Sequence, residues 1–367
     1  MDRVAVHGAP LERGRQYGRL AAPRIGRSLA AYRDVFQHRV GLEWEVAVAH
    51  ARSFLPAIEA FAPESLHEMQ GIAHGASVPF DAILALNCRS ELMFAAAHRK
   101  GEAPPGECTS FAATPAASDE GHMLLGQNWD WVPFAREVSV LLEVQRDDAP
   151  SFATIVEAGM LAKVGMNAAG FGLCTNTLVS ARDAERTGVP YHVMLRKLLD
   201  ARTVDDAARI LGSVERALSA NYLVADHTGA AINFETIAGG KSDMRATRPQ
   251  AGLIAHSNHF LAPEFAAIDA YVANSPHSVT RLADMRQGLA DSERLTVTRL
   301  QAVLRSHAHA PNGICSHPDP AAHPLYARTT VASFVADVTA GEFWFTDGPP
   351  CETTYQPYRF QPAIAHS

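Results

Sequence analysis

The sequence predicts an α+β protein whose sheets pack face to face and are covered by helices. Up to about residue 100, apolar residues recur at three- and four-residue intervals, which is typical of helices. From residue 109 on, short segments separated by Gly, Asp and Pro indicate antiparallel strands. There is no regular strand–helix alternation, no GxGxxG sequence and no P-loop, which argues against a dinucleotide-binding α/β fold.

The individual elements follow from the same patterns. Helices are expected over 11–40, 44–61 and 63–76, and Pro63 suits the first turn of the third. Strands are expected over 109–114, 123–128, 139–145, 152–157 and 170–176, followed by helices over 191–201 and 204–211. The remaining predictions are strands over 220–226, 231–235, 252–256, 329–338 and 342–346, and one long helix over 278–304.

The composition excludes several classes of function. A chain of 367 residues with 47% hydrophobic residues can bury a large core. The net charge is −7 and the 32 Lys and Arg residues are scattered, so nucleic acid is not an expected partner. The N-terminus has no apolar segment of signal-peptide length, and no segment approaches ~18 uninterrupted apolar residues. We therefore expect a soluble, cytoplasmic protein with no membrane partner.

The five cysteines, at positions 88, 108, 174, 315 and 351, contain no CxxC pair. In a long chain without an export signal this favours free thiols over disulfides. Cys88 and Cys174 lie in apolar segments, as expected of buried cysteines. Cys108 differs because it follows 101–107, a Gly-, Pro- and Glu-rich segment that we expect to be an exposed loop.

Cys108 and Asp130 form the most informative pair of residues. Cys108 begins one predicted strand, and Asp130 follows the end of the next strand, in Gly126-Gln127-Asn128-Trp129-Asp130. Two antiparallel strands joined by a tight turn would bring both residues together. This arrangement predicts a nucleophile at the head of a sheet, although Asp130 could also simply end a strand in an Asx turn.

Several short sequence blocks are found at 14–18, 71–73, 86–91, 108–110, 126–130, 165–172, 255–260, 328–333 and 348–351. Taken in their order along the chain, these blocks resemble the N-terminal-nucleophile hydrolase superfamily. Within it, the chain is most similar to the family of the acyl-coenzyme A:6-aminopenicillanic acid acyltransferase, a peptidase C45-like family. Penicillin V acylase and bile salt hydrolase are more distant relatives.

The resemblance implies one domain over 1–367 with a four-layer αββα sandwich. It also implies a zymogen that cleaves itself at Glu107–Cys108 into a helical fragment 1–107 and a catalytic fragment 108–367, which then remain partners. The thiol would attack the preceding carbonyl, and hydrolysis of the resulting thioester would free the α-amine of Cys108. The family often has Gly before the nucleophile, so Glu107 is a departure that bears on the rate of self-cleavage.

The resemblance further implies a cysteine amidohydrolase or acyltransferase acting on a small N-acyl amine or acyl thioester through a thioester on Cys108. The α-amine, with an ordinary pKa near ~8, would serve as its general base. By the resemblance, Asn258 would donate to the oxyanion and Asn176 would make a second contact with it. Asp130 would orient the α-ammonium, and Arg328 would align the thiolate and the carboxylates. Ser110 would assist self-cleavage. The resemblance does not decide between hydrolysis and acyl transfer. It also leaves open whether the protein forms a homo-oligomer.

Other interpretations compete with these roles. Asn258 and Asn176 could satisfy buried backbone groups, and Arg328 could be a surface cation. A papain-like enzyme would need a histidine to activate Cys108, and the chain has 17 histidines but no Cys-Gly-x-Cys-Trp sequence. The more serious alternative is an unprocessed, non-catalytic relative that serves as a binding protein.

A His-rich segment at 306–317 contains residue types that bind zinc, namely His307, His309, Cys315 and His317. Their spacing fits no common zinc pattern. We therefore expect a solvated loop here, without a metal, and no cofactor elsewhere.

Overall fold

The structure is a computed structural model that describes residues 1–100, 107–183, 186–273, 275–291 and 294–360. Two sheets form its centre. The order of the first sheet is β1 (Asp2–His7), β4 (Ser139–Gln145), β5 (Phe152–Glu157), β6 (Val164–Asn167), β7 (Phe171–Thr177), β8 (Ala220–Asp226), β9 (Ala231–Thr236) and β10 (Met244–Thr247). The order of the second is β11 (Leu253–His256), β2 (Glu107–Ala113), β3 (Leu124–Trp131), β12 (Thr329–Asp337), β13 (Glu342–Phe345) and β14 (Gln356–Arg359).

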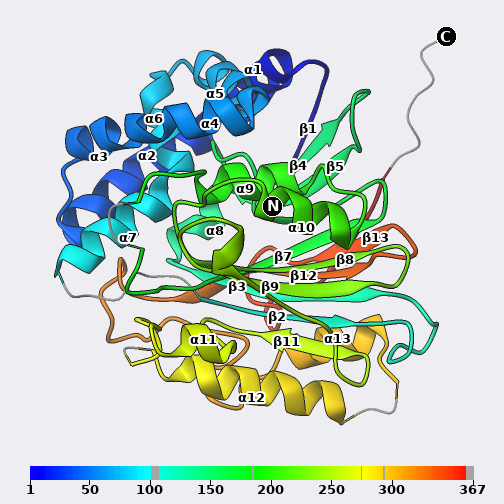
Figure 1. Cartoon of the computed structure of the whole chain (residues 1–367). Coiled ribbons are helices and arrows are strands. Elements are labelled where there is room, and N and C mark those ends of the chain that lie inside the picture. The colour runs from blue at the N-terminus through cyan, green and yellow to red at the C-terminus, as the bar shows by residue number, and fades with distance from the viewer. Residues whose placement is uncertain (101–106, 184–185, 274, 292–293, 361–367) are drawn as a thin grey trace.

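Helices cover the outer face of each sheet (Figure 1). The first sheet is covered by α1 (Pro10–Leu20), α2 (Ala22–Asp34), α3 (Trp44–Ala51), α4 (Leu55–Phe61), α5 (Pro63–Ala76), α6 (Phe80–Asn87), α7 (Arg89–Lys100), α9 (Tyr191–Leu198) and α10 (Val204–Gly212). On the other side, α12 (His277–Ala290) and α13 (Val297–Leu304) pack on β2, β11 and β12. Two short helices are α8 (Phe134–Val138) and α11 (Pro263–Ala266). These layers confirm the predicted α+β, αββα architecture.

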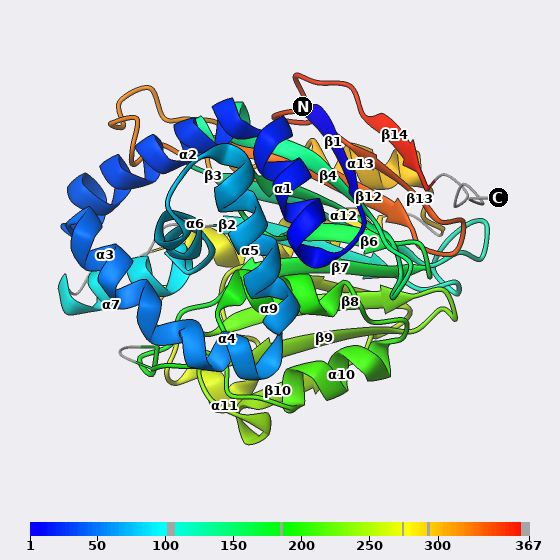
Figure 2. The ribbon, with the colours of Figure 1, turned by 90° about the horizontal axis from the view of Figure 1, so that it is seen from above.

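Several predicted boundaries are wrong, mostly in the N-terminal part. The expected helix 11–40 is divided at Ala21, because Pro23 has no N–H to donate and its ring would crowd the preceding turn. Residues 2–7, which we did not expect to be extended, form β1 and pair in parallel with β4. Figure 2 shows β1 beside β4 at the edge of the sheet. Helices α6, α7, α8 and α11 and strands β6, β10 and β14 were not predicted. The expected helices 44–61 and 278–304 are each divided in two.

Helices α1 and α5 pack with their backbones in contact, which explains two of the glycine-containing sequence blocks. A Cβ atom added to Gly14 would lie 2.3 Å from the carbonyl oxygen of Glu68. One added to Gly71 would lie 2.2 Å from the carbonyl oxygen of Leu11. Any side chain at either position would therefore push the two helices apart.

Strand alternation decides which residues of β2 face which layer. Ser110 points between the sheets, where its hydroxyl donates to Asn176 Oδ1 on β7 at 2.7 Å. Thr109 points the other way and accepts from Arg281 of α12 at 2.7 Å. Because side chains alternate along a strand, Cys108 shares the inner face with Ser110, and Glu107 shares the α12 face with Thr109. Polar and reactive side chains at the start of β2 therefore face both the other sheet and helix α12.

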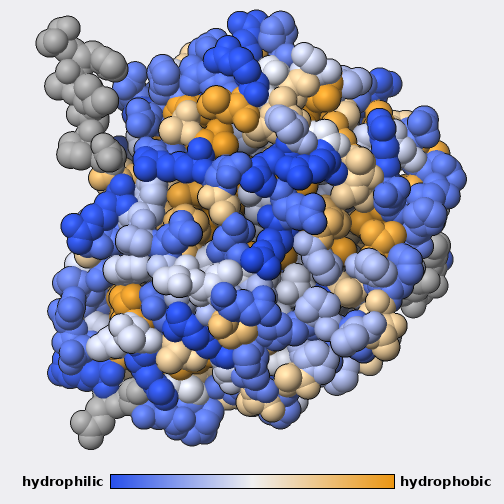
Figure 3. Space-filling view, turned by 180° about the vertical axis from the view of Figure 1, so that it is seen from behind, coloured by the Kyte–Doolittle hydropathy of each residue, from blue (hydrophilic) through white to orange (hydrophobic). Residues whose placement is uncertain are grey.

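None of the described helices is long and apolar enough to span a membrane. The face turned away from the viewer in Figure 1 is mostly hydrophilic, with small hydrophobic areas scattered over it (Figure 3). Such scattered apolar residues are normal on protein surfaces.

Candidate active site

Cys108 and Asp130 lie on adjacent strands, with an offset of one residue. Cys108 is paired with Trp129, and Asp130 is paired with Glu107. The Asp130 carboxylate therefore lies on the α12 face, whereas the Cys108 side chain points between the sheets. The backbone N–H of Asp130 acts to lower the pKa of the Cys108 thiol, against the effect of burial. Cys108 and Asp130 are therefore close together, as predicted. Their side chains lie on opposite faces of the sheet, with the backbone of β2 between them.

The backbone of Cys108 is held by two side chains, one from the segment after β11 and one from α12. Its N–H donates to Asn258 Oδ1 at 2.7 Å, and its carbonyl accepts from Arg281 Nη1 at 2.8 Å. Arg281 Nη2 also donates to Asn258 Oδ1 at 3.0 Å. The Asn258 nitrogen donates to the carbonyl of Thr177 at 2.9 Å. In the intact chain, Asn258 therefore offers its oxygen to Cys108 and uses its nitrogen elsewhere.

Glu107 is buried, so the prediction that the exposed loop extends to this residue is wrong; the rest of that loop, 101–106, lies outside the described residues. Its carboxylate forms ion pairs with Arg328, with His277 and, at 2.9 Å, with Arg281. Tyr271 also donates to it at 3.1 Å. Burial alone would raise the pKa of Glu107, but Arg281, Arg328 and His277 outweigh it and lower the pKa to about 2. Glu107 is thus anchored as an anion.

Asp130 is buried with only one of its oxygens satisfied. Its Oδ1 accepts from Thr330 at 2.6 Å, and its Oδ2 has no hydrogen-bond partner among the described residues. Burial raises the pKa of Asp130 to about 6, although Arg281 and Arg328 act in the opposite direction. This half-satisfied carboxylate has room to accept one more donor.

The Cys108 thiol lies in an apolar environment beside Lys163. Burial raises the pKa of Cys108 to about 12, with the Asp130 charge adding to the effect and Lys163 opposing it. Lys163 is itself buried, and burial together with the Arg89 charge lowers its pKa to about 8. Its Nζ lies 4.4 Å from the centre of the Trp129 ring. Among the residues that the structure describes, no histidine forms a hydrogen bond with the thiol, which disfavours a papain-like pair.

The remaining predicted residues belong to the same network. Asn176 is buried on β7 and accepts from Ser110 and, at 2.9 Å, from Asn221. Arg328 is not a free surface cation, because its guanidinium pairs with Glu107 and donates to Ser316 Oγ at 2.9 Å. All the residues that the sequence singled out for catalysis therefore lie around the start of β2.

Sequence reasoning missed Arg281, Lys163, His277 and Tyr271. Arg281 lies in a predicted helix whose other buried positions are apolar except for Ser278, and the apolar pattern does not show that an arginine is buried among them. Lys163 lies just before 165–172, one of the blocks that resemble the family. That position was the one feature of the sequence that could have pointed to Lys163. The other two contact Glu107 from more than 160 positions away, which no local pattern can indicate.

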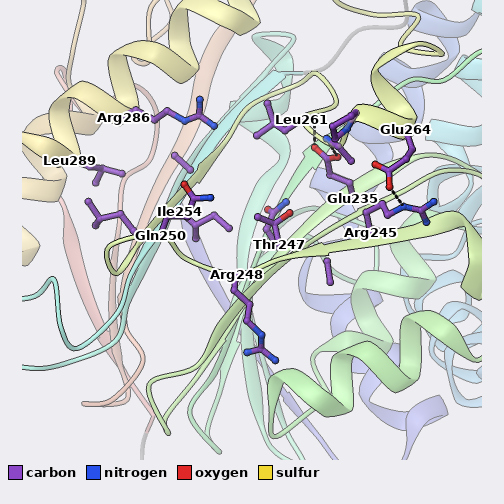
Figure 4. A pocket seen from close by; sticks show the side chains of 16 residues that line it. Glu235, Arg245, Thr247, Arg248, Gln250, Ile254, Leu261, Glu264, Arg286 and Leu289 are labelled. Carbon is purple, nitrogen blue, oxygen red and sulfur yellow. Dashed lines mark hydrogen bonds and ion pairs between the residues drawn. The ribbon is translucent and has the colours of Figure 1, made fainter.

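A cavity of about 680 Å³ lies between β9, β10, β11 and α12 (Figure 4). Its lining includes Glu235, Arg245, Arg248 and Arg286, but none of the residues predicted to be catalytic. Glu235 connects the cavity to the site, because its carboxylate accepts from His256, two residues before Asn258, at 2.7 Å.

Comparison with known proteins identifies the family. The family described as "Acyl-coenzyme A:6-aminopenicillanic acid acyl-transferase" matches residues 117–310, more than half of the chain. The chain belongs to this family. The matched range contains Asp130, Asn176 and Asn258. The description of the family names an acyltransferase.

One relative and two solved structures are similar to this chain. The 40 kDa form of acyl-coenzyme A:6-aminopenicillanic-acid-acyltransferase from Emericella nidulans is 27% identical over 263 residues, which are 71% of this chain and 70% of the relative. A variant of the conjugated bile acid hydrolase from Clostridium perfringens has a TM-score of 0.45 at 13% identity, covering 71% of this chain and 99% of that one. Penicillin V acylase from Agrobacterium tumefaciens has a TM-score of 0.43 at 15% identity, covering 65% and 82%.

Proposed function

We propose that the chain is a cysteine amidohydrolase or acyltransferase that first cleaves its own Glu107–Cys108 bond. The observation that carries this proposal is the head of β2, where Cys108 follows an anchored residue and lies beside a carboxylate with one free oxygen. In self-cleavage, the Cys108 sulfur attacks the Glu107 carbonyl carbon and the thiol proton passes to the Cys108 nitrogen as the C–N bond breaks. Water then hydrolyses the thioester, leaving a carboxylate on Glu107 and a free thiol and amine on Cys108.

The new α-amine is the proposed general base. A free α-amine has an ordinary pKa near ~8, so it can take the thiol proton at neutral pH. Asp130 supports this role because its Oδ2 can accept a hydrogen bond from the new ammonium. Asn258 Oδ1, which holds the Cys108 N–H at 2.7 Å, can hold the amine in the same place. Lys163 provides a positive charge on the thiol side of the strand.

Acyl transfer then repeats the same chemistry on a substrate. The Cys108 sulfur attacks the carbonyl of an N-acyl amine, the α-amine passes the thiol proton to the leaving nitrogen, and water or another acceptor releases the acyl group. Asn176 and Asn258 are the proposed donors to the oxyanion. For Asn258 this requires its amide to turn away from the Thr177 carbonyl, because its nitrogen donates there in the intact chain.

The two fragments are expected to stay together after cleavage, because buried polar contacts join them. Arg89 in 1–107 pairs with Glu157 in 108–367 at 2.8 Å, and both side chains are almost fully buried. Asn87 donates to the carbonyl of Gly159 at 3.0 Å. Separating the fragments would break these contacts and would also expose the apolar core that residues of both fragments share.

The surroundings of Glu107 suggest which acyl groups the site accepts. During self-cleavage the glutamyl residue is the acyl group on Cys108, so the protein is its own first substrate. When the Glu107 carboxylate moves out of the site, Arg281 and Arg328 lose the anion that they share and are left with the charge of Asp130 for two guanidinium groups, which is unfavourable for buried charges. The proposed substrates therefore carry a carboxylate on the acyl group, about as far from the reacting carbonyl as in glutamate.

A matched pair of substrates tests this function. Self-cleaved protein is incubated with N-glutamyl and N-glutaminyl derivatives of the same amine, and amine release is followed together with the mass of fragment 108–367. We expect a transient increase by the acyl mass and at least ~10-fold faster cleavage of the acidic substrate, since charge-assisted hydrogen bonds are the stronger ones. Equal rates would contradict only the acyl preference. A fragment that never gains an acyl group from any substrate would contradict the catalytic role of Cys108.

A further inference from the structure

Four zinc-ligand side chains from two distant segments converge beside the active site. His307, Cys315 and His317 come from the segment that follows α13, and Cys351 comes from the turn after β13. One ligand atom from each of the four lies within 4.8 Å of the others. His309, which the sequence had grouped with them, instead pairs with Asp284 at 2.7 Å and is not part of this Cys/His cluster.

The distances within the Cys/His cluster are those of a tetrahedral site. The two sulfurs are 3.5 Å apart and the two Nε2 atoms are 3.0 Å apart. His317 Nε2 lies 3.6 Å from Cys315 Sγ and 3.2 Å from Cys351 Sγ. With ordinary zinc–ligand bonds, a tetrahedron places two sulfurs about 3.8 Å apart, two nitrogens about 3.3 Å apart, and sulfur about 3.6 Å from nitrogen. Four of the six pairwise distances are therefore within about 0.4 Å of the tetrahedral values, and the other two are within 4.8 Å.

A neighbouring carboxylate supports the same interpretation. His317 directs Nε2 toward the two sulfurs, and its Nδ1 lies 3.3 Å from Glu352 Oε1. Metal-binding histidines commonly donate their second ring N–H to a carboxylate, which sets the tautomer and the ring orientation. Glu352 directly follows the ligand Cys351 in the chain, so both features come from one turn.

We propose that His307, Cys315, His317 and Cys351 bind one zinc ion. Two thiolates and two imidazoles are a donor set that suits zinc, and four protein ligands leave no open position for a reacting water. The site is therefore structural. A Cys315–Cys351 disulfide is the competing state, but it would need the sulfurs to approach to about 2.05 Å and would give the two histidines no role.

The ion would fasten the segment that supports the catalytic carboxylate. Ser316, between two of the ligands, donates its N–H to Thr330 Oγ1 at 2.9 Å, and Thr330 in turn donates to Asp130. Ser316 Oγ also accepts from Arg328. The zinc site would thus tie the turn at 348–352 to residues that position Asp130 and Arg328. Metal binding itself does not depend on the proposed catalysis.

Metal content tests the proposal, measured on protein purified without chelator. We expect one zinc per chain in the wild type and in His309→Ala, which removes the neighbouring histidine outside the cluster. His317→Ala and Cys351→Ser should lose at least ~10-fold in zinc content. The uncleavable Cys108→Ala chain should keep its zinc, which separates this proposal from the one on function. Zinc-free wild type that takes up no zinc on addition would overturn the site, as would a mass lower by two hydrogens at Cys315 and Cys351.

Alkylation of the wild type gives a second test that needs no variant. Cys351 is exposed, so as a free thiol it should react readily with iodoacetamide. Bound to zinc, it should react at least ~10-fold more slowly until a chelator is added. Equal rates of Cys351 modification with and without chelator would contradict the proposal.

Discussion

Glu107 and Asp130 are carboxylates that face each other across the ladder between β2 and β3, yet their surroundings are opposite. Glu107 is surrounded by Arg281, Arg328 and His277, which lower its pKa to about 2. Asp130 has Thr330 on one oxygen and no partner among the described residues on the other, and burial raises its pKa to about 6. Glu107 is therefore an ion-paired anion, whereas ionised Asp130 is disfavoured by burial. Under the proposed function, the second oxygen of Asp130 accepts the new α-ammonium of Cys108.

The largest expected effect is on turnover, from Asp130→Asn. If Asp130 orients the α-ammonium, its loss should reduce turnover per cleaved chain about 100-fold or more, in the range typical of positioned acid–base groups. The measurement is amine release from the best N-acyl amine, normalised to the amount of fragment 108–367. Turnover within about threefold of the wild type would mean that the free oxygen of Asp130 has no catalytic role.

The two carboxylates should have opposite effects on stability. In the uncleavable Cys108→Ala chain, Glu107→Gln should lower the free energy of unfolding at pH 7 by about 3 kcal/mol, which corresponds to a pKa of about 2 against an ordinary 4.5. Asp130→Asn should leave it unchanged or raise it, because the ionised carboxylate is disfavoured by burial. Urea unfolding of the three chains measures this. If Glu107→Gln and Asp130→Asn lowered the free energy of unfolding equally, the two carboxylates would not differ in their effect on stability.

The same difference has a pH signature with two signs. The folded-state pKa of Glu107 lies below its unfolded value, so its contribution is present above about pH 4.5 and is lost as the pH falls toward about 2. The folded-state pKa of Asp130 lies above its unfolded value, so its contribution is present below about pH 4 and is lost as the pH rises through about 6. Relative to Cys108→Ala, Asp130→Asn should therefore gain stability from pH 4 to 7. A flat difference over that range would contradict the raised pKa of Asp130.

The smallest expected effect concerns the thiol side of the strand. Lys163→Met should raise the pKa of the Cys108 thiol, because the buried ammonium beside it opposes the effect of burial. Alkylation of Cys108 in cleaved protein should slow about tenfold at pH 7, equivalent to one pKa unit. Lys163→Arg, which keeps the charge, is the control. If both variants react at the wild-type rate, Lys163 has no electrostatic role at Cys108.

Local patterns predicted part of this molecule well. Strands 139–145, 152–157 and 220–226 and helix 63–76 have the predicted bounds, because turn residues or a proline mark their ends. The pairing of Cys108 with the region of Asp130 followed from two adjacent strands. Arg281 and Lys163 could not be found in this way, since their contacts depend on how α12 and the first sheet pack against β2. The proposed zinc site needs Cys351, which the turn after β13 brings to the other three residues, so the spacing of residues 306–317 could not indicate it.

The most direct test is the mass of the purified chain. We expect two fragments, 1–107 and 108–367, for the wild type and one intact chain for Cys108→Ala. The two wild-type fragments should elute together on gel filtration under native conditions. A wild-type chain that remains intact after prolonged incubation at neutral pH, with Cys108 unreactive toward iodoacetamide, would contradict the proposal that Cys108 becomes an N-terminal nucleophile.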